Sequence, residues 1–508
     1  MTPSHSTNHD DTPAGRGQPD TPKRVDEHQI FAPDAGAGAI VLAVLVILLV
    51  AATRQLNFDE SLALHSGWLY VTGSMNGLGF LMPVVLLIGS FAWLIPDPAV
   101  VLTGLRFLVV LSMGLVFLAA KIHMKLPLTF FVIWVLFTLS NGAFLTHALE
   151  FRYDWAILVS WIGAFILIAG RSQIKYILLG VICAWLLFHH LKGVFYAGWL
   201  YLFVMVAIYL DGTVASRTRS WVQLNVSLVA FVTAWILIVL SLGRMEDLIN
   251  LYIRFFELSR EVVVEQSFSH VLYRLQKDAW WWVLSAIGMA FILVSRRHSP
   301  EILWAIVFAA VPAVFVVLHP LPWAYLIAPI VPFVAFITVT SIYQLLVWSS
   351  RKGAQIRPGL VVVLATLVFL AATLKEAIPQ YQDNWLPGTA SVLRVIKAHA
   401  KAGDTVVDPS GTVYFIQPVH PEWYSDTLFR ELAKQELWQK SLEHSVSLAD
   451  WALNSHRLGW LTDGATVRVQ EQMPVVCGPV RMRAEDPRYD TLKEGCEIQH
   501  MDQIESNW

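Results

Sequence analysis

Long runs of apolar residues, separated by short polar connectors, make up most of the chain. A helix needs about 20 predominantly apolar residues to cross the roughly 30 Å hydrocarbon core of a bilayer. By this criterion we predict about eleven spans, near residues 37–53, 101–120, 126–145, 155–170, 174–190, 195–210, 221–242, 279–295, 300–318, 322–347 and 359–374. The pattern therefore predicts an α-helical polytopic membrane protein.

Residues 79–95 form a further apolar segment that is interrupted by Pro83 and followed by Pro96, Asp97 and Pro98. If this segment does not cross, the basic connectors all lie on the side of Lys23 and Arg24, as the positive-inside rule requires. Those connectors contain Lys121 and Lys125, Arg171 and Lys175, Arg217 and Arg219, Arg296 and Arg297, and Arg351, Lys352 and Arg357. We therefore predict a re-entrant or interfacial helix here and a cytoplasmic amino terminus.

The two ends of the chain differ from the apolar middle. Residues 1–36 are rich in Pro, Gly, Asp, Thr and His without apolar periodicity, which predicts a disordered cytoplasmic tail. An odd number of spans places residues 375–508 outside the cytoplasmic membrane. That tail alternates helix-like runs with short apolar strands and predicts a small α/β domain, with helices near 391–401 and 428–442 and strands near 405–407, 413–416 and 467–469. Cys477 and Cys496 would then lie where a disulfide can form.

Composition supports a membrane protein and excludes several other classes. Of the 508 residues, 56% are hydrophobic and 15% charged, and the mean hydropathy is +0.55. With 36 Lys and Arg against 38 Asp and Glu, the chain has no basic excess of the kind that would indicate a nucleic-acid partner. The three cysteines, without CxxC or HExxH motifs, exclude a disulfide scaffold and give no support to a structural zinc or iron–sulfur site.

With this orientation, most of the unusual polar clusters fall at the external ends of the spans. They lie at residues 56–65, 147–154, 189–193 and 319–325. The longest outer connector, residues 243–278, interleaves basic and apolar residues in a way that suits a surface helix near lipid headgroups. The span centres hold almost no ionisable residues, which disfavours a proton relay or ion-coupled transport. We therefore predict a polar site at the outer water–lipid boundary.

Several of these clusters occur in the order and topology of a known superfamily. The chain has Asp59-Glu60 after the first span, an apolar half-helix before the second, Glu150-x-Arg152-x-Asp154 after the third, Lys192-Gly193 after the fifth and His319-Pro320-x-Pro322-x-x-Tyr325 after the ninth. This layout resembles the GT-C superfamily of polyprenyl-phosphate-sugar glycosyltransferases, within the branch of protein O-mannosyltransferases and lipid A aminoarabinose transferases. One departure is that many relatives have Arg-Pro-Asp where this chain has Arg152-Tyr153-Asp154.

The resemblance covers residues 37–374. It implies a GT-C-like transmembrane domain with interfacial helices near residues 57–95, followed by an extracytoplasmic domain at residues 375–508. It also implies an enzyme of a bacterial-type inner membrane that transfers a monosaccharide from a polyprenyl-phosphate donor to an acceptor hydroxyl on a glycan, lipid or protein. The displacement would invert the anomeric configuration.

The resemblance places the general base at Asp59, and the adjacent Glu60 would raise its pKa by like-charge repulsion. An alternative is that both carboxylates cap the interfacial helix. The expected contacts to the donor phosphate are basic residues of the outer face, namely Lys192, Arg254, Arg260 and Arg274. Each could instead bind lipid headgroups or extend its charge to the interface from a span end.

Glu150 and Asp154 could position the acceptor or hold a divalent cation, or both could pair with Arg152. Further candidate substrate contacts are His65, His189, His190, His319 and Tyr325, although an interfacial histidine also serves as a hydrogen-bonded packing residue. Two other functions stay open: a translocator of a lipid-linked glycan, and a non-catalytic membrane scaffold whose outer domain binds an envelope partner.

Overall fold

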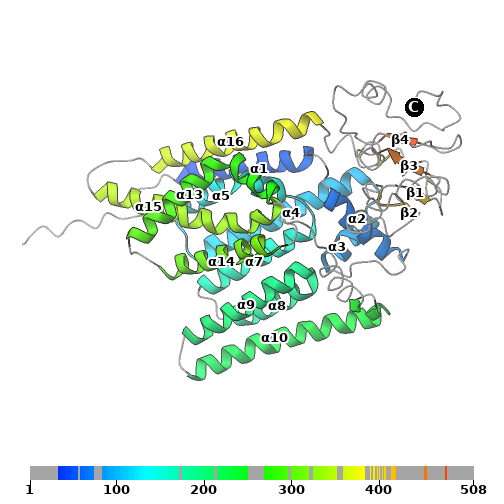
Figure 1. Ribbon diagram of the computed structural model, residues 1–508, viewed down its shortest axis with the longest axis horizontal. Helices are drawn as coiled ribbons and strands as arrows, with labels where there is room; N and C mark the ends of the chain where they lie inside the picture. Colours follow the sequence, from blue (N-terminus) through cyan, green and yellow to red (C-terminus); the bar gives the residue numbers. More distant parts are fainter. Residues whose placement is uncertain are drawn as a thin grey trace, which may run out of the picture.

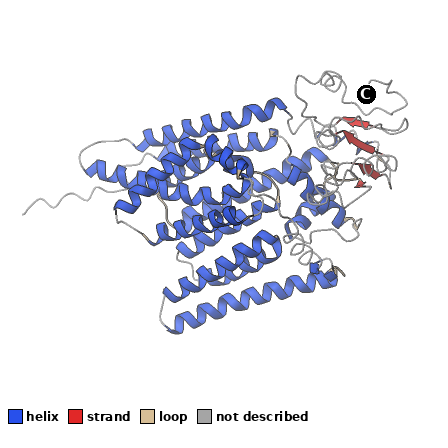
Figure 2. Ribbon diagram, viewed as in Figure 1, coloured by secondary structure: helices blue, strands red, loops and turns tan. Residues whose placement is uncertain are grey.

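The computed structural model describes residues 33–383 except for 55, 57, 74–82, 171–173, 211–213, 247, 250–267, 296–298, 320–323 and 352–357, and short stretches between residues 390 and 477. The predicted cytoplasmic tail therefore lies outside the described residues, apart from the beginning of the first helix. Helices make up nearly all of the described chain before residue 383, and the strands follow it (Figure 2).

Most helices run side by side along the long axis of the molecule, and α2 and α3 lie at one end of this bundle beside the strands (Figure 1). The helices are α1 (Pro33–Thr53), α2 (Phe58–Val71), α3 (Pro83–Leu94), α4 (Pro98–His123), α5 (Leu128–Leu139), α6 (Gly142–His147), α7 (Tyr153–Ala169), α8 (Lys175–His189), α9 (Leu191–Leu210), α10 (Val214–Ser241), α12 (Ser269–Lys277), α13 (Ala279–Ser295), α14 (Pro300–Leu318), the 3-10 helix η2 (Ala324–Ile330), α15 (Val331–Arg351) and α16 (Pro358–Asp383).

Among the described residues, seven helices are long and apolar enough to cross a membrane, or eight if α12 and α13, which meet at an 81° bend, form one broken span. Four shorter apolar helices accompany them: Pro83–Leu94, Leu128–Leu139, Asp154–Ala169 and Lys175–His189. The prediction of a helical multi-pass membrane protein is thus confirmed.

Apolar residues predominate in both the centre and the periphery of the bundle, and burial rather than composition separates the two. In the apolar window of Ala324–Ser349, 78% of residues are buried, against 11% in Val214–Ser241. The indole N–H groups of the buried Trp134, Trp161 and Trp281 donate to backbone carbonyls at 2.8, 3.0 and 2.8 Å. An apolar interior offers no water to a buried donor, so these bonds fix where each ring can lie.

The predicted interfacial segment forms α2 and α3, which pack together through glycine. A Cβ atom on Gly67 would lie 2.3 Å from the carbonyl oxygen of Val85, and one on Gly89 would lie 2.0 Å from that of Gly67. Only glycine therefore permits this backbone approach. Helix α3 has 12 residues and so extends about 18 Å, which is too short to cross a hydrocarbon core alone.

Two predicted boundaries are wrong. The predicted span 126–145 breaks into α5 and α6, because the side-chain oxygen of Asn141 accepts the Phe144 N–H and starts a new helix. The predicted strand 413–416 is a bend and turn. Its apolar residues Val413, Tyr414 and Ile416 are buried in a cluster with residues of α2, α3 and α4, so their hydrophobicity reflects packing on helices rather than strand pairing.

A four-stranded parallel sheet follows the helices, with strand order β2-β1-β3-β4. Its strands are β1 (Thr405–Val407), β2 (Gln417–Pro418), β3 (Trp451–Asn454) and β4 (Val475–Cys477). The first of these matches the prediction for residues 405–407. The predicted strand 467–469, the predicted helix 428–442 and Cys496 lie outside the described residues, and the predicted helix 391–401 is described only in part.

Candidate functional site

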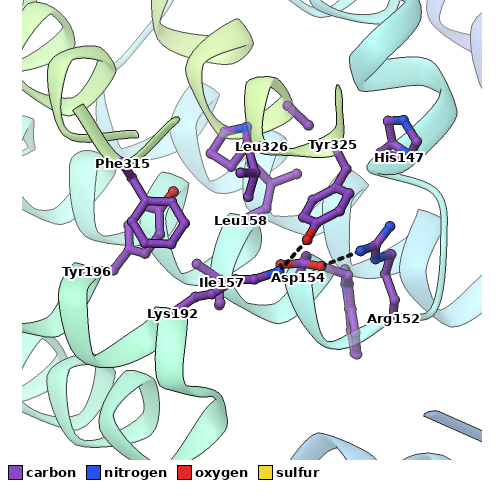
Figure 3. Close-up of a pocket in the computed structure, with 13 residues that line it drawn as sticks. His147, Arg152, Asp154, Ile157, Leu158, Lys192, Tyr196, Phe315, Tyr325 and Leu326 are labelled. Carbon is purple, nitrogen blue, oxygen red and sulfur yellow. Dashed lines mark hydrogen bonds and ion pairs between the residues drawn. The ribbon is translucent and has the colours of Figure 1, made fainter. Parts of the chain in front are cut away.

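A pocket lies where the first turns of α7 and α9 meet η2 and the end of α14 (Figure 3). Its polar lining is His147, Arg152, Asp154, Lys192 and Tyr325, and its apolar lining includes Ile157, Leu158, Phe315, Leu326 and Pro329. About 420 Å³ of space, part of it open to solvent, is free of protein atoms. The sequence-predicted residues 152, 154, 192 and 325 therefore lie together, although they come from three separate parts of the chain.

Local structure places each of these side chains at a helix end. Arg152 precedes α7 with extended backbone dihedrals, and Asp154 lies in the first turn of α7, where a helix dipole favours a carboxylate. Lys192 is the second residue of α9. Tyr325 belongs to η2, a 3-10 segment that turns the chain between α14 and α15.

Asp154 lies between two cations. Its Oδ1 is 3.0 Å from Lys192 Nζ, and its Oδ2 is 2.9 Å from an Arg152 Nη (Figure 3). Lys192 Nζ also donates to Tyr325 Oη at 3.0 Å. Both cations lie over the Tyr325 ring, with Arg152 Cζ 3.9 Å and Lys192 Nζ 4.3 Å from its centroid. The ring face and the carboxylate together hold two positive charges close to each other.

The network continues from Arg152 to Glu150, which is buried. Arg54, directly after α1, forms an ion pair with Glu150, and Arg152 Nη1 lies 3.2 Å from Glu150 Oε2. Burial would raise the pKa of Glu150, but the charge of Arg54, together with His147 and Arg152, holds it well below its usual range. Among the described side chains of this network, three cations therefore face two carboxylates, and one positive charge is in excess.

Glu60 lies in a separate buried ion pair. Its two carboxylate oxygens accept from Arg106 Nε at 3.0 Å and Nη2 at 2.6 Å, and Oε1 also accepts the Phe151 N–H at 3.2 Å. The Arg106 charge offsets that of Glu60, so we assign Glu60 to fixing α2 against α4 rather than to repelling Asp59. Asp59 lies in the first turn of α2. The Glu60 contact brings this turn beside the loop that carries Glu150 and Arg152, whereas the Asp59 side chain lies outside the described residues.

The histidines divide between pocket and packing. His147 lines the pocket, and burial lowers its pKa against the opposing effect of Glu150. His190 Nδ1 accepts the Lys192 N–H at 3.0 Å, and burial holds its pKa well below the ordinary value. His65 and His189 are fully buried, and His189 stacks on Trp185 with ring centroids 5.5 Å apart. The His319 ring meets Phe315 edge-on at 5.2 Å.

Arg274 does not lie at the pocket. Its guanidinium is buried between Glu376, 3.0 Å from Nη1, and Asp278, 3.3 Å from Nε. Because Arg274 is buried in this cluster and does not line the pocket, the geometry does not support the predicted contact. Arg254 and Arg260 lie outside the described residues.

In the described part of the chain, no group of three or more His, Cys, Asp or Glu side chains is arranged to bind a divalent cation. Glu150 and Asp154 are instead bridged by Arg152, as the ion-pair alternative has it.

Sequence reasoning missed Arg54 and Arg106. Arg106 lies inside a predicted span, where an ionisable residue is rare and marks a buried partner or a site, so this signal could have identified it. His147 and Tyr196, which also line the pocket, carry no comparable signal.

Comparison with models of known protein families gave no match, and comparison with curated protein sequences gave none either.

Proposed function

We propose that this protein is an integral membrane glycosyltransferase that takes a monosaccharide from a polyprenyl-phosphate donor and transfers it to an extracytoplasmic acceptor hydroxyl. The proposal rests on the layout resemblance, and one observation of the structure carries it furthest. The polar end of the pocket holds Lys192, Arg152 and Tyr325 around Asp154, and apolar side chains form the remaining wall. A lipid phosphate needs both of these surfaces.

In this proposal the chain crosses an inner membrane eleven times. Seven long apolar helices and the bent pair of α12 and α13 provide eight crossings, and α5 continued by α6, together with α7 and α8, provides the other three. Helix α3 does not cross. The basic ends of α4, α8 and α10 then face the cytoplasm, and the pocket, α2 and the sheet lie on the outer side, where residues 375–508 form the extracytoplasmic domain.

The cation pair would bind the donor phosphate. Lys192 supplies a point charge that suits phosphate oxygens, and the adjacent Arg152 guanidinium, which Glu150 and Asp154 hold in place, adds a second positive charge beside it. Before the donor binds, Asp154 prevents the two cations from repelling each other and keeps them in place. This preorganisation matters because groups that are already oriented cost little reorganisation when charge develops on the leaving phosphate.

The transfer would be a single displacement at the anomeric carbon. Asp59 takes the proton of the acceptor hydroxyl, and the acceptor oxygen forms the new bond to the anomeric carbon. The bond from that carbon to the phosphate oxygen breaks, and its electron pair leaves with the polyprenyl phosphate. Lys192 and Arg152 stabilise the charge that accumulates there, and attack from the opposite face inverts the configuration.

Binding and turnover can be tested separately with the full-length protein in lipid nanodiscs. The affinity for polyprenyl phosphate, the sugar-free product, reports on the phosphate site and can be measured without knowing which sugar the donor carries. Lys192→Ala is expected to weaken its binding about tenfold or more, whereas Lys175→Ala, a lysine at the other end of the adjacent helix, should leave it unchanged. Equal affinities in wild type and Lys192→Ala would overturn the phosphate site.

Turnover is measured with a panel of radiolabelled polyprenyl-phosphate hexoses and pentoses. Asp59→Asn should retain polyprenyl-phosphate binding and lose sugar transfer by about 10²-fold or more. Unchanged transfer in Asp59→Asn would remove the proposed base. Movement of the labelled donor across vesicles without any bond cleavage would instead favour a translocator.

A further inference from the structure

A second buried charged cluster lies at the bend between α12 and α13. Arg274 Nη1 lies 3.0 Å and Lys277 Nζ 3.1 Å from the carboxylate of Glu376, which lies on α16, and Arg274 Nε lies 3.3 Å from Asp278. Arg274, Asp278 and Glu376 are each at most 7% exposed. Two cations and two carboxylates balance, so these four side chains carry no net charge that would attract a phosphate.

This cluster holds the beginning of α6. The Ala143 N–H donates to Asp278 Oδ2 at 3.2 Å, which satisfies one of the backbone donors that a helix leaves open in its first turn. A Cβ atom on Gly142 would come within 2.1 Å of Arg274 Nη2, so the guanidinium lies directly against the backbone at this glycine. The start of α6 is therefore fitted to Arg274 and Asp278.

The other end of α6 is held by the pocket network. Thr146 accepts at its side-chain oxygen from Arg274 Nη2 at 3.4 Å, and at its carbonyl from Arg54. Arg54 also pairs with Glu150, and His147 lines the pocket. Two arginines that are distant in the chain, one directly after α1 and one in α12, thus hold one short helix, and the chain continues from it directly into the loop that carries Arg152.

We infer that Arg274, Asp278 and Glu376 are positioning residues for the pocket. They fix α6, and through it the loop with Arg152, and they tie this loop to α16. The inference rests on the proposed function. It also replaces the predicted role of Arg274 as a phosphate contact, and Glu376→Gln distinguishes the two roles.

If Arg274 bound phosphate, removing the competing carboxylate in Glu376→Gln would free the guanidinium and tighten polyprenyl-phosphate binding. A positioning role predicts no tightening, sugar transfer reduced about tenfold, and backbone hydrogen exchange in residues 142–152 accelerated about tenfold. Arg274→Lys keeps the charge but cannot contact Glu376, Asp278 and Thr146 together, so it should show the same accelerated exchange with no change in charge.

The exchange measurement uses full-length protein in nanodiscs and requires no substrate. Arg394→Gln serves as the matched control, because it breaks an exposed ion pair with Asp97 outside the cluster and should leave exchange in residues 142–152 unchanged. Unchanged exchange in both Glu376→Gln and Arg274→Lys, or tighter polyprenyl-phosphate binding in Glu376→Gln, would overturn the inference. If the wild-type protein transfers no sugar but hydrogen exchange is accelerated in the variants, the proposed function is refuted, whereas the role of Arg274, Asp278 and Glu376 in fixing α6 is supported.

Discussion

The buried pair of Glu60 and Arg106 allows a quantitative test, because removing one partner should cost more than removing both. Glu60 is fully buried and Arg106 1% exposed, and their contact is a parallel two-bond fork. Glu60→Gln preserves the shape and can still accept the Phe151 N–H, but it removes the carboxylate charge that Arg106 pairs with in the described structure. Breaking such a pair costs about 3–5 kcal/mol.

The double variant Glu60→Leu with Arg106→Met removes both charges. Replacing a buried pair by apolar residues is roughly neutral, so the remaining loss is that of the Phe151 N–H and of the Ala51 and Arg54 carbonyls, which lose Glu60 and Arg106 as hydrogen-bond partners, at about 1 kcal/mol for each bond. We therefore expect Glu60→Gln to be less stable than the double variant.

Unfolding by SDS in mixed micelles, followed by tryptophan fluorescence, measures both free energies. Arg394→Gln is the control, since its ion pair with Asp97 is exposed and screened by solvent and should leave the free energy of unfolding unchanged. A Glu60→Gln protein within about 1 kcal/mol of wild type, or a double variant that is less stable than Glu60→Gln, would refute the role of Glu60 in fixing α2 against α4.

Three further outcomes follow from the structure. Gly67→Val should abolish the packing of α3 on α2 and lower the yield of folded protein in size-exclusion chromatography, whereas Gly38→Val, with open space around it, should not. Equal yields would contradict the close approach of the α2 and α3 backbones. The pKa values of His147 and His190 are lowered in the folded protein, so the unfolded chain binds more protons below about pH 6.5. The free energy of unfolding should therefore fall by up to about 1.4 kcal/mol for each histidine as the pH is lowered from 7.5 to 5.5. This loss should be smaller in His190→Gln, and an unchanged pH profile in that variant would argue against a buried neutral ring. Trp161→Phe should destabilise by about 1–3 kcal/mol because the Phe308 carbonyl loses its donor, which a thermal melt in detergent detects and an unaltered melt would disprove.

Membrane crossing could be predicted from the sequence because it depends on about 20 consecutive residues and not on their neighbours in space. The apolar run at residues 98–123, for example, is sufficient to identify α4. The strand at residues 405–407 was also predictable from its local pattern. The break at Asn141 was not, because a single polar residue within an apolar run starts a new helix only where its side chain caps the backbone.

The same division applies to the site. The sequence by itself identified Asp154, Lys192 and Tyr325 as unusual polar residues at the ends of apolar segments. Which of them touch was decided by tertiary packing, since Lys192 and Tyr325 are separated by 133 positions in the chain and Glu60 and Arg106 by 46. An ion pair depends on where helices place their ends in three dimensions. From the sequence, the basic side chain of Arg274 suggested a phosphate contact. Only the packed bundle shows that Arg152 lies at the pocket, whereas Arg274 is held away from it by two carboxylates.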